Sequence, residues 1–173
     1  LIDDLIPGTI SLGYLEKVLC LLLREGVPIR DMETILETLG DHAGALKDID
    51  IVTEYVRQAL KRTITRRFAE ANSLRVITVD PKVEDTIVAS VKKSDAGSYL
   101  AMDPDLIQKI VNITSGEIDK VKDVIPNVII LTSPIVRIYF KKLIDQFIPN
   151  ITVLSYSEID NTAQIQAIGN IAM

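Results

Sequence analysis

The sequence is poor in the side chains that carry most enzyme chemistry. Its 173 residues include one cysteine, Cys20, one histidine, His42, and no tryptophan. These are too few for a Cys/His zinc site or for a Cys-His nucleophilic pair. A single cysteine also excludes an internal disulfide. Because Cys20 stands within Leu19-Cys20-Leu21-Leu22, we expect a buried thiol in a reducing compartment, by default the cytoplasm.

Glycine-rich phosphate loops are missing as well. None of the 8 glycines forms G-x-x-x-x-G-K-[ST] or G-x-G-x-x-G, so the sequence encodes no cradle for a nucleotide. Ser133 lacks a G-x-S-x-G setting and a histidine nearby in the sequence, so we expect it to cap a helix. We expect no catalytic residue, no metal and no cofactor.

Long apolar runs are absent too. No run approaches the roughly 20 apolar residues that a membrane-spanning helix needs, so we expect the chain itself to stay out of the bilayer. The chain begins at Leu1, and no basic segment precedes an apolar stretch. We therefore expect no signal peptide and a fragment of a longer protein, with any membrane anchor before Leu1.

The net charge of −5 is unevenly distributed along the chain. Residues 1–54 hold eleven acidic and four basic side chains, a net charge of −7, whereas residues 55–73 hold five basic and one acidic, a net charge of +4. These charges form either separate solvated helix faces or complementary surfaces that meet between copies. No aromatic residue is interleaved with the basic side chains to stack on bases, so we expect no nucleic-acid partner.

The first part of the sequence has helical periodicity. Ser11 is expected to cap a helix that ends near Arg24 with Gly26 in the left-handed conformation, and Pro28 is expected to start the next helix. Residues 48–71 are expected to form one long amphipathic helix capped by Asp48. Its apolar stripe is expected to face the core. A basic face, which includes Arg57, Arg62 and Arg66, lies largely outside that stripe.

The second part alternates short β-branched runs with helical patterns. Strands are expected at 74–79, 99–102, 128–132, 151–155 and 163–168. Three of them lead into Asp80-Pro81, Asp103-Pro104 and Ser133-Pro134, each a capping residue followed by proline at the first helical position. We therefore predict an α+β to α/β fold. A helical subdomain (1–73) precedes a three-layer α/β subdomain (74–173) with a mainly parallel sheet.

Three motifs carry a family resemblance: LLREGVPIRDMETILETLGDHA (22–43), TEYVRQALKRTI (53–64) and VLSYSEI (153–159). They resemble the family of the flagellar export-gate protein FlhA and its virulence type III secretion counterparts, specifically the last part of the family's cytoplasmic region. The match runs almost end to end and agrees with the division at residue 73. The first motif is long and rather specific.

The resemblance implies a non-enzymatic role at the cytoplasmic face of the bacterial inner membrane. Family members form a nonameric ring and receive export chaperones, their substrates and the stalk of the export ATPase. Ring contacts are credited to the helical subdomain, and the membrane would be reached only through the missing N-terminal part. Within the matching motifs and the basic face, the candidate ring-interface residues are Arg24, Arg30, Asp31, Glu37, Arg57, Arg62 and Arg66. Intrachain salt bridges are the alternative role for the members within the first motif. The alternative function is a small-anion-binding or receiver-like α/β domain.

Overall fold

A computed structural model describes residues 2–173. The sequence predicts the tail of a helix over residues 1–6, stopped at Pro7-Gly8, and its first residue, Leu1, lies outside the described residues. The chain packs as two compact units. Unit 1 comprises residues 1–69 and the short segment 157–160, and unit 2 comprises residues 70–156 and 161–173. The sequence-based division into subdomains 1–73 and 74–173 stays a prediction.

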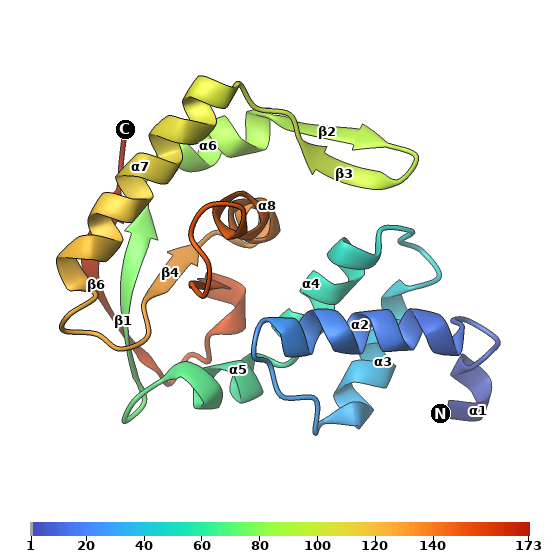
Figure 1. Cartoon of the computed structure of the whole chain (residues 1–173). Coiled ribbons are helices and arrows are strands. Elements are labelled where there is room, and N and C mark those ends of the chain that lie inside the picture. The colour runs from blue at the N-terminus through green and yellow to red at the C-terminus, as the bar shows by residue number, and fades with distance from the viewer. Residues whose placement is uncertain (1) are drawn as a thin grey trace. The chain divides into compact units, whose positions relative to one another are not determined.

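Unit 1 is helical (Figure 1). Its helices are α1 (Ile2–Leu5), α2 (Leu12–Arg24), α3 (Met32–His42), α4 (Ile49–Ala59) and α5 (Lys61–Phe68). Side chains buried among them include Leu15, Val18, Leu22, Ile35, Leu36, Leu39, Val52, Val56, Leu60 and Ile64. In α2, α3 and α4 the buried residues recur at steps of three or four, the spacing that places side chains on one face.

Local capping in unit 1 follows the sequence with one exception. Ser11 Oγ accepts the Tyr14 N–H at 3.0 Å and Asp48 Oδ1 accepts the Asp50 N–H at 3.0 Å. Gly26 has φ of +75°, the left-handed conformation expected after α2. The expectation that Pro28 starts the next helix was wrong, because Asp31 caps α3 and the helix begins at Met32.

The expected single helix over 48–71 is two helices, with the break at Leu60. The Leu60 N–H lies 3.0 Å from both Val56 O and Arg57 O, a tightened turn that ends α4. Leu60 and Ile64 are nevertheless buried, so the apolar stripe continues across the break and periodicity alone could not reveal it. The second helix ends at Phe68, because Ala71 and Asn72 adopt positive φ in the turn before the first strand.

Unit 2 is a parallel four-stranded sheet with helices (Figure 1). The strands β1 (Ser73–Val79), β4 (Ile129–Thr132), β5 (Thr152–Ser155) and β6 (Gln164–Ile171) lie in the order β5-β4-β1-β6, and every pair is parallel. The connecting helices are α6 (Pro81–Ala89), α7 (Pro104–Val121) and α8 (Pro134–Asp145), and the 3₁₀ helix η1 (Tyr156–Glu158) follows β5. The mixed α/β class with a mainly parallel sheet is therefore confirmed.

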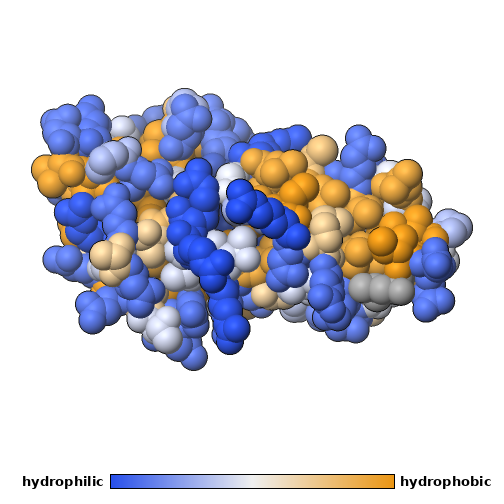
Figure 2. All heavy atoms as spheres, turned by 90° about the horizontal axis from the view of Figure 1, so that it is seen from below, coloured by the Kyte–Doolittle hydropathy of each residue, from blue (hydrophilic) through white to orange (hydrophobic). Residues whose placement is uncertain are grey.

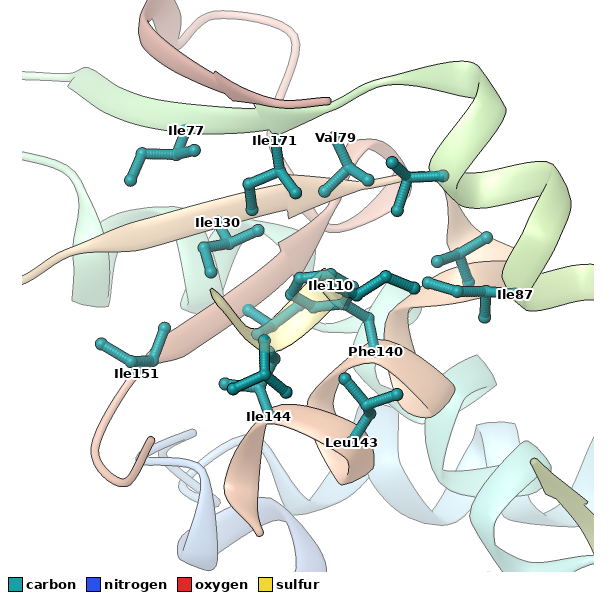
Figure 3. Packing of buried hydrophobic residues seen from close by; sticks show 14 of the residues in the cluster. Ile77, Val79, Ile87, Ile110, Ile130, Phe140, Leu143, Ile144, Ile151 and Ile171 are labelled. Atoms are coloured by element: carbon teal, nitrogen blue, oxygen red, sulfur yellow. The ribbon is translucent and has the colours of Figure 1, made fainter. Parts of the chain in front are cut away.

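One hydrophobic core joins the sheet to these three helices. Ile77 and Ile130 from neighbouring strands, Ile87 of α6, Ile110 of α7 and Phe140 of α8 all belong to it, and each is fully buried. Figure 3 shows them pointing into a shared interior. Phe140 has the largest purely apolar side chain that is fully buried in this core, so the α8 face that carries it is fixed against the sheet.

The expected strand at 99–102 was assigned to the wrong sheet. Only Tyr99 and Leu100 of it lie in a strand, β3 (Gly97–Leu100), which pairs with β2 (Val91–Ser94) as a separate antiparallel hairpin. Gly97 has φ of +121°, and the Asp95-Ala96 turn before it brings β3 back along β2. The following helix α7 is still capped as expected, because Asp103 Oδ1 accepts the Asp105 N–H at 2.9 Å.

Candidate protein-interaction site

The surface of unit 1 carries most of the charged residues that the sequence singled out. Arg24 is the last residue of α2, Arg30 and Asp31 precede α3, and Glu37 lies within α3. On α5, Arg62 and Arg66 are exposed. These six candidates are all accessible to a partner, and all belong to unit 1.

Arg57, unlike these six candidates, is buried, so the expectation that it lies on an exposed basic face was wrong. Its side chain is 2% exposed, and its Nε and Nη2 donate to Glu158 Oε2 and Oε1 at 2.8 and 2.9 Å. Glu158 is itself 1% exposed. A buried guanidinium is costly unless its charge is compensated, and the paired N–H groups of arginine match the two oxygens of a carboxylate. Arg57 therefore stabilises unit 1 from within.

Glu158 is a partner that sequence reasoning missed. It belongs to the short segment 157–160 of unit 1, which is also held by Thr65 of α5. Thr65 Oγ1 accepts the Asp160 N–H at 2.8 Å and donates to Glu158 O at 3.5 Å. Glu25 adds a second carboxylate, with its Oε1 3.8 Å from Arg57 Nη1. The motif VLSYSEI contains Glu158, but nothing local in the sequence pairs it with Arg57.

Asp31 is an exposed candidate with a defined local role. Its Oδ2 accepts the Thr34 hydroxyl at 2.6 Å and its Oδ1 accepts the Thr34 N–H at 3.1 Å. The hydrogen bonds from the Thr34 side chain and backbone lower the pKa of Asp31 below the usual carboxyl value. Asp31 therefore stays ionised at neutral pH and stabilises the start of α3.

The single cysteine, Cys20, and the single histidine, His42, both lie on helices of unit 1. Cys20 is exposed, so the expectation of a buried thiol was wrong. Val18 and Leu22 of α2 face the core, and Cys20, midway between them in sequence, lies on the opposite side of the helix. His42 is the last residue of α3, and its ring stacks on Tyr55 with centroids 4.4 Å apart.

The carboxyl ends of the parallel strands in unit 2 offer no open anion site at α8. The Glu84 carboxylate accepts the Ser133 N–H at 2.7 Å, so a negative group of the protein already occupies this helix start. Ser133 occupies the N-cap position of α8, as expected, but its side chain makes no capping hydrogen bond. Asp80 does cap α6, through the Lys82 N–H at 3.2 Å.

Residues 2–173 show no cluster of three metal-binding side chains. In the same part of the chain, no helix combines the length and apolar character needed to cross a bilayer.

A pocket of about 230 Å³ in unit 2 lies among β3, α7 and α8, and its lining includes Tyr99, Ile107 and Tyr139. It is smaller than the roughly 300 to 1,000 Å³ typical of ligand pockets. On the face drawn in Figure 2, hydrophobic groups lie between hydrophilic ones.

Comparison with known proteins identifies the fold. The chain is 39% identical over 170 residues to the flagellar biosynthesis protein FlhA of Bacillus subtilis, covering 98% of this chain and 25% of the relative. The solved structure of the Chlamydia pneumoniae CdsV protein superposes with a TM-score of 0.86 at 35% identity, over 99% of this chain and 48% of that one. CdsV in complex with CdsO gives a TM-score of 0.83 over 95% of this chain and 48% of that one. Nonameric EPEC SctV-C gives 0.83 at 30% identity, over 94% of this chain and 49% of that one.

These similarities define a C-terminal cytoplasmic domain of the type III export-gate class. The chain belongs to the FHIPEP family, whose model matches residues 1–164. It spans about a quarter of the length of its Bacillus relative and about half of the solved chains. The resemblance seen in the sequence motifs is thereby confirmed.

Proposed function

We propose that this chain is part of the cytoplasmic region of a bacterial type III protein export gate and helps to assemble that region into a ring. The observation that carries the proposal is the likeness to SctV-C, which is nonameric, over 94% of this chain. The parent protein is proposed to be anchored in the inner membrane by a part outside these 173 residues. The domain itself would then face the cytoplasm.

The proposed work of the domain is protein binding rather than catalysis. CdsV, which shares this fold, has been solved in complex with CdsO, and this supports a stalk-like partner for the assembled ring. Export chaperones and their substrates are proposed as further partners of the parent protein. The scarcity of histidine and cysteine supports a domain without catalytic residues or cofactors.

The proposed ring contact uses the exposed charges of unit 1. A ring requires a heterologous interface, in which two different surfaces of one subunit meet. Arg62 and Arg66 of α5 provide a cationic surface, and Glu37 of α3 is among the exposed acidic residues that can face it in the next copy. Arg24, Arg30 and Asp31 remain proposed members of this contact. Arg57 contributes only indirectly, because its charge is buried and paired.

Native mass spectrometry of the parent protein's full cytoplasmic region tests the proposal. We expect a closed ring of nine copies that weakens as salt is raised, because exposed charges are screened over roughly 8 Å at physiological ionic strength. A two-fold dimer as the end state would contradict the proposal, because a dimer uses one surface twice and leaves none to continue a ring. Calorimetry with ATP and with zinc tests the non-enzymatic part. Tight, saturable binding of either would contradict that part, and binding of ATP would also favour the small-anion alternative.

A further inference from the structure

The pocket of unit 2 is built from one face of α8, from the hairpin strand β3 and from α7. The residues of α8 that line it recur at helical spacing, so they share one side of the helix: Tyr139, Lys142, Leu143 and Gln146. Residues 98–100 of β3 and Ile107 of α7 complete the lining. Figure 1 shows the hairpin between α6 and α7. All of these residues belong to unit 2, so the pocket is complete within that unit.

Most of the pocket wall is aromatic or aliphatic. Tyr139 is 7% and Leu143 is 3% exposed, whereas Tyr99 is 50% exposed, so the pocket has a buried inner wall and an accessible rim. Its volume of about 230 Å³ is small for a nucleotide or a drug-sized molecule. A cavity of about 150 Å³ with an apolar lining, however, is enough to bind benzene. The space therefore suits one aromatic ring with a short substituent.

The rim of the pocket is cationic. Lys142 lines the pocket and is exposed. On the other strand of the hairpin, Lys92 and Lys93 lie directly opposite Tyr99 and Ser98, which both belong to the lining. Residues that face each other in an antiparallel pair are neighbours on the sheet, so both lysines stand one strand away from the rim. A negative group on the ligand is favoured there.

The acidic residues close to the pocket do not cancel this charge. Asp145, which precedes Gln146, is paired with Lys141, whose Nζ lies 2.8 Å from its Oδ1. Asp95 is in the turn of the hairpin, beyond the paired residues. Lys142 already interacts within the chain, but an ammonium group has three N–H donors and can hold a further acceptor.

We propose that this pocket binds a small aromatic carboxylate. The ring of the ligand packs against Tyr139 and Leu143, and its carboxylate accepts an N–H from Lys142 at the rim. A free aromatic acid and a phenylalanine at the C-terminus of a peptide share this chemistry. The site goes beyond the proposed function and does not depend on it, because the pocket lies within one unit of one copy.

Methyl NMR of the 173-residue chain, titrated with phenylacetate, tests the site. We expect saturable shifts of the Leu100, Ile107 and Leu143 methyl signals and none of Ile35, in the core of unit 1. The dissociation constant should be on the order of 1 mM or tighter, within the binding efficiency that small ligands reach. Acetate lacks the ring and benzyl alcohol lacks the charge, so each should bind at least fivefold more weakly. An absence of saturable shifts with phenylacetate would overturn the inference, as would equal binding of benzyl alcohol.

Two variants assign the contacts. Lys142→Met keeps the aliphatic stem and removes the charge, so it should weaken phenylacetate binding at least fivefold. Lys82→Met, a matched change at an exposed lysine of α6 outside the lining, should leave binding unchanged. Ile107→Phe places a ring in the pocket and should abolish binding while the methyl spectrum of unit 1 stays the same. Binding at the wild-type level in either Lys142→Met or Ile107→Phe would overturn the inference.

A further titration distinguishes the two sources of the ligand. The peptide acetyl-Gly-Gly-Phe carries the ring and a terminal carboxylate, and its C-terminal amide is the matched uncharged control. Tighter binding of the peptide than of phenylacetate, with loss of binding in the amide, would identify a chain end as the ligand. Tighter binding of phenylacetate would identify a free acid. Equal binding of the peptide and its amide at this pocket would contradict the role of the carboxylate.

Discussion

Arg57 of α4 and Glu158 of η1 form a buried, two-point ion pair across 101 residues of sequence. The Arg57 Nε and Nη2 atoms lie 2.8 and 2.9 Å from the two carboxylate oxygens. Both side chains are almost fully excluded from solvent. Removal of one member of such a pair leaves the other as an uncompensated buried charge.

Replacement of Arg57 by methionine should therefore cost about 3 to 5 kcal/mol in the free energy of unfolding. The double variant Arg57→Met/Glu158→Met should be closer to the wild type, because neither charge then remains unpaired. Urea unfolding measures both. Arg62→Met, an exposed change on α5, is the control and should stay within about 0.5 kcal/mol of the wild type. A cost below about 1 kcal/mol for Arg57→Met would mean that water reaches Glu158.

Thr34 should control the titration of Asp31. The Thr34 hydroxyl contributes most to the lowered pKa of Asp31, so Thr34→Val should raise that pKa toward the usual carboxyl value, whereas Thr34→Ser should not. A lowered carboxyl pKa stabilises the fold above the ordinary carboxyl range, and this stabilisation is lost as the pH falls through the lowered value. The stability difference between the two variants should therefore disappear in acid. NMR titration of the Asp31 carboxyl checks the shift, and equal titration in both variants would contradict the assignment.

Gly26 and Gly116 should respond in opposite ways to a methyl group. Gly26 has φ of +75°, so Gly26→Ala should cost about 1 kcal/mol through backbone strain. The nearest atom to the new methyl group, Phe68 Cζ, is 3.8 Å away, so steric overlap adds little. Gly116 lies inside α7 with nothing within 4 Å, and Gly116→Ala should stabilise the chain by about 0.4 to 1 kcal/mol. Thermal unfolding of the two variants side by side decides the sign of each effect.

Reversal of the exposed cations of α5 should weaken ring assembly without unfolding the domain. Exposed ion pairs contribute only about 0.2 to 1 kcal/mol each, so one reversal should do little and Arg62→Glu/Arg66→Glu should have a measurable effect. Arg75→Glu, an exposed reversal in β1 of unit 2, is the matched control. Native mass spectrometry of the full cytoplasmic region gives the result. Assembly of the double variant at the wild-type concentration would show that α5 faces solvent or another partner.

The 173-residue chain by itself should be largely monomeric at low micromolar concentration. A ring contact of this type normally depends on the high local concentration that an anchored parent protein supplies. Sedimentation velocity over a range of concentrations should show weak self-association at the highest ones. A closed dimer that persists at nanomolar concentration would contradict both this expectation and the heterologous contact.

The sequence alone predicted features that depend on neighbouring residues. Asp48, Asp80 and Asp103 were recognised as helix caps because a cap is formed within a few residues of the helix start. The α/β class followed from the alternation of short β-branched runs with helical patterns. The left-handed Gly26 also follows from a local rule, since glycine adopts positive φ with little cost. The family resemblance added the type of protein, which periodicity could not supply.

Tertiary structure decided which residues of a pattern face inward. Arg57 was expected on an exposed basic face, but Glu158, 101 residues away, compensates its charge inside unit 1. Cys20 was expected to be buried, yet the core of α2 uses Val18 and Leu22 and leaves the thiol outside. The hairpin of β2 and β3 likewise depends on a pairing partner rather than on its own composition. Burial and pairing depend on distant residues that folding brings together. Periodicity along the chain therefore cannot determine which residues are buried or which residues pair.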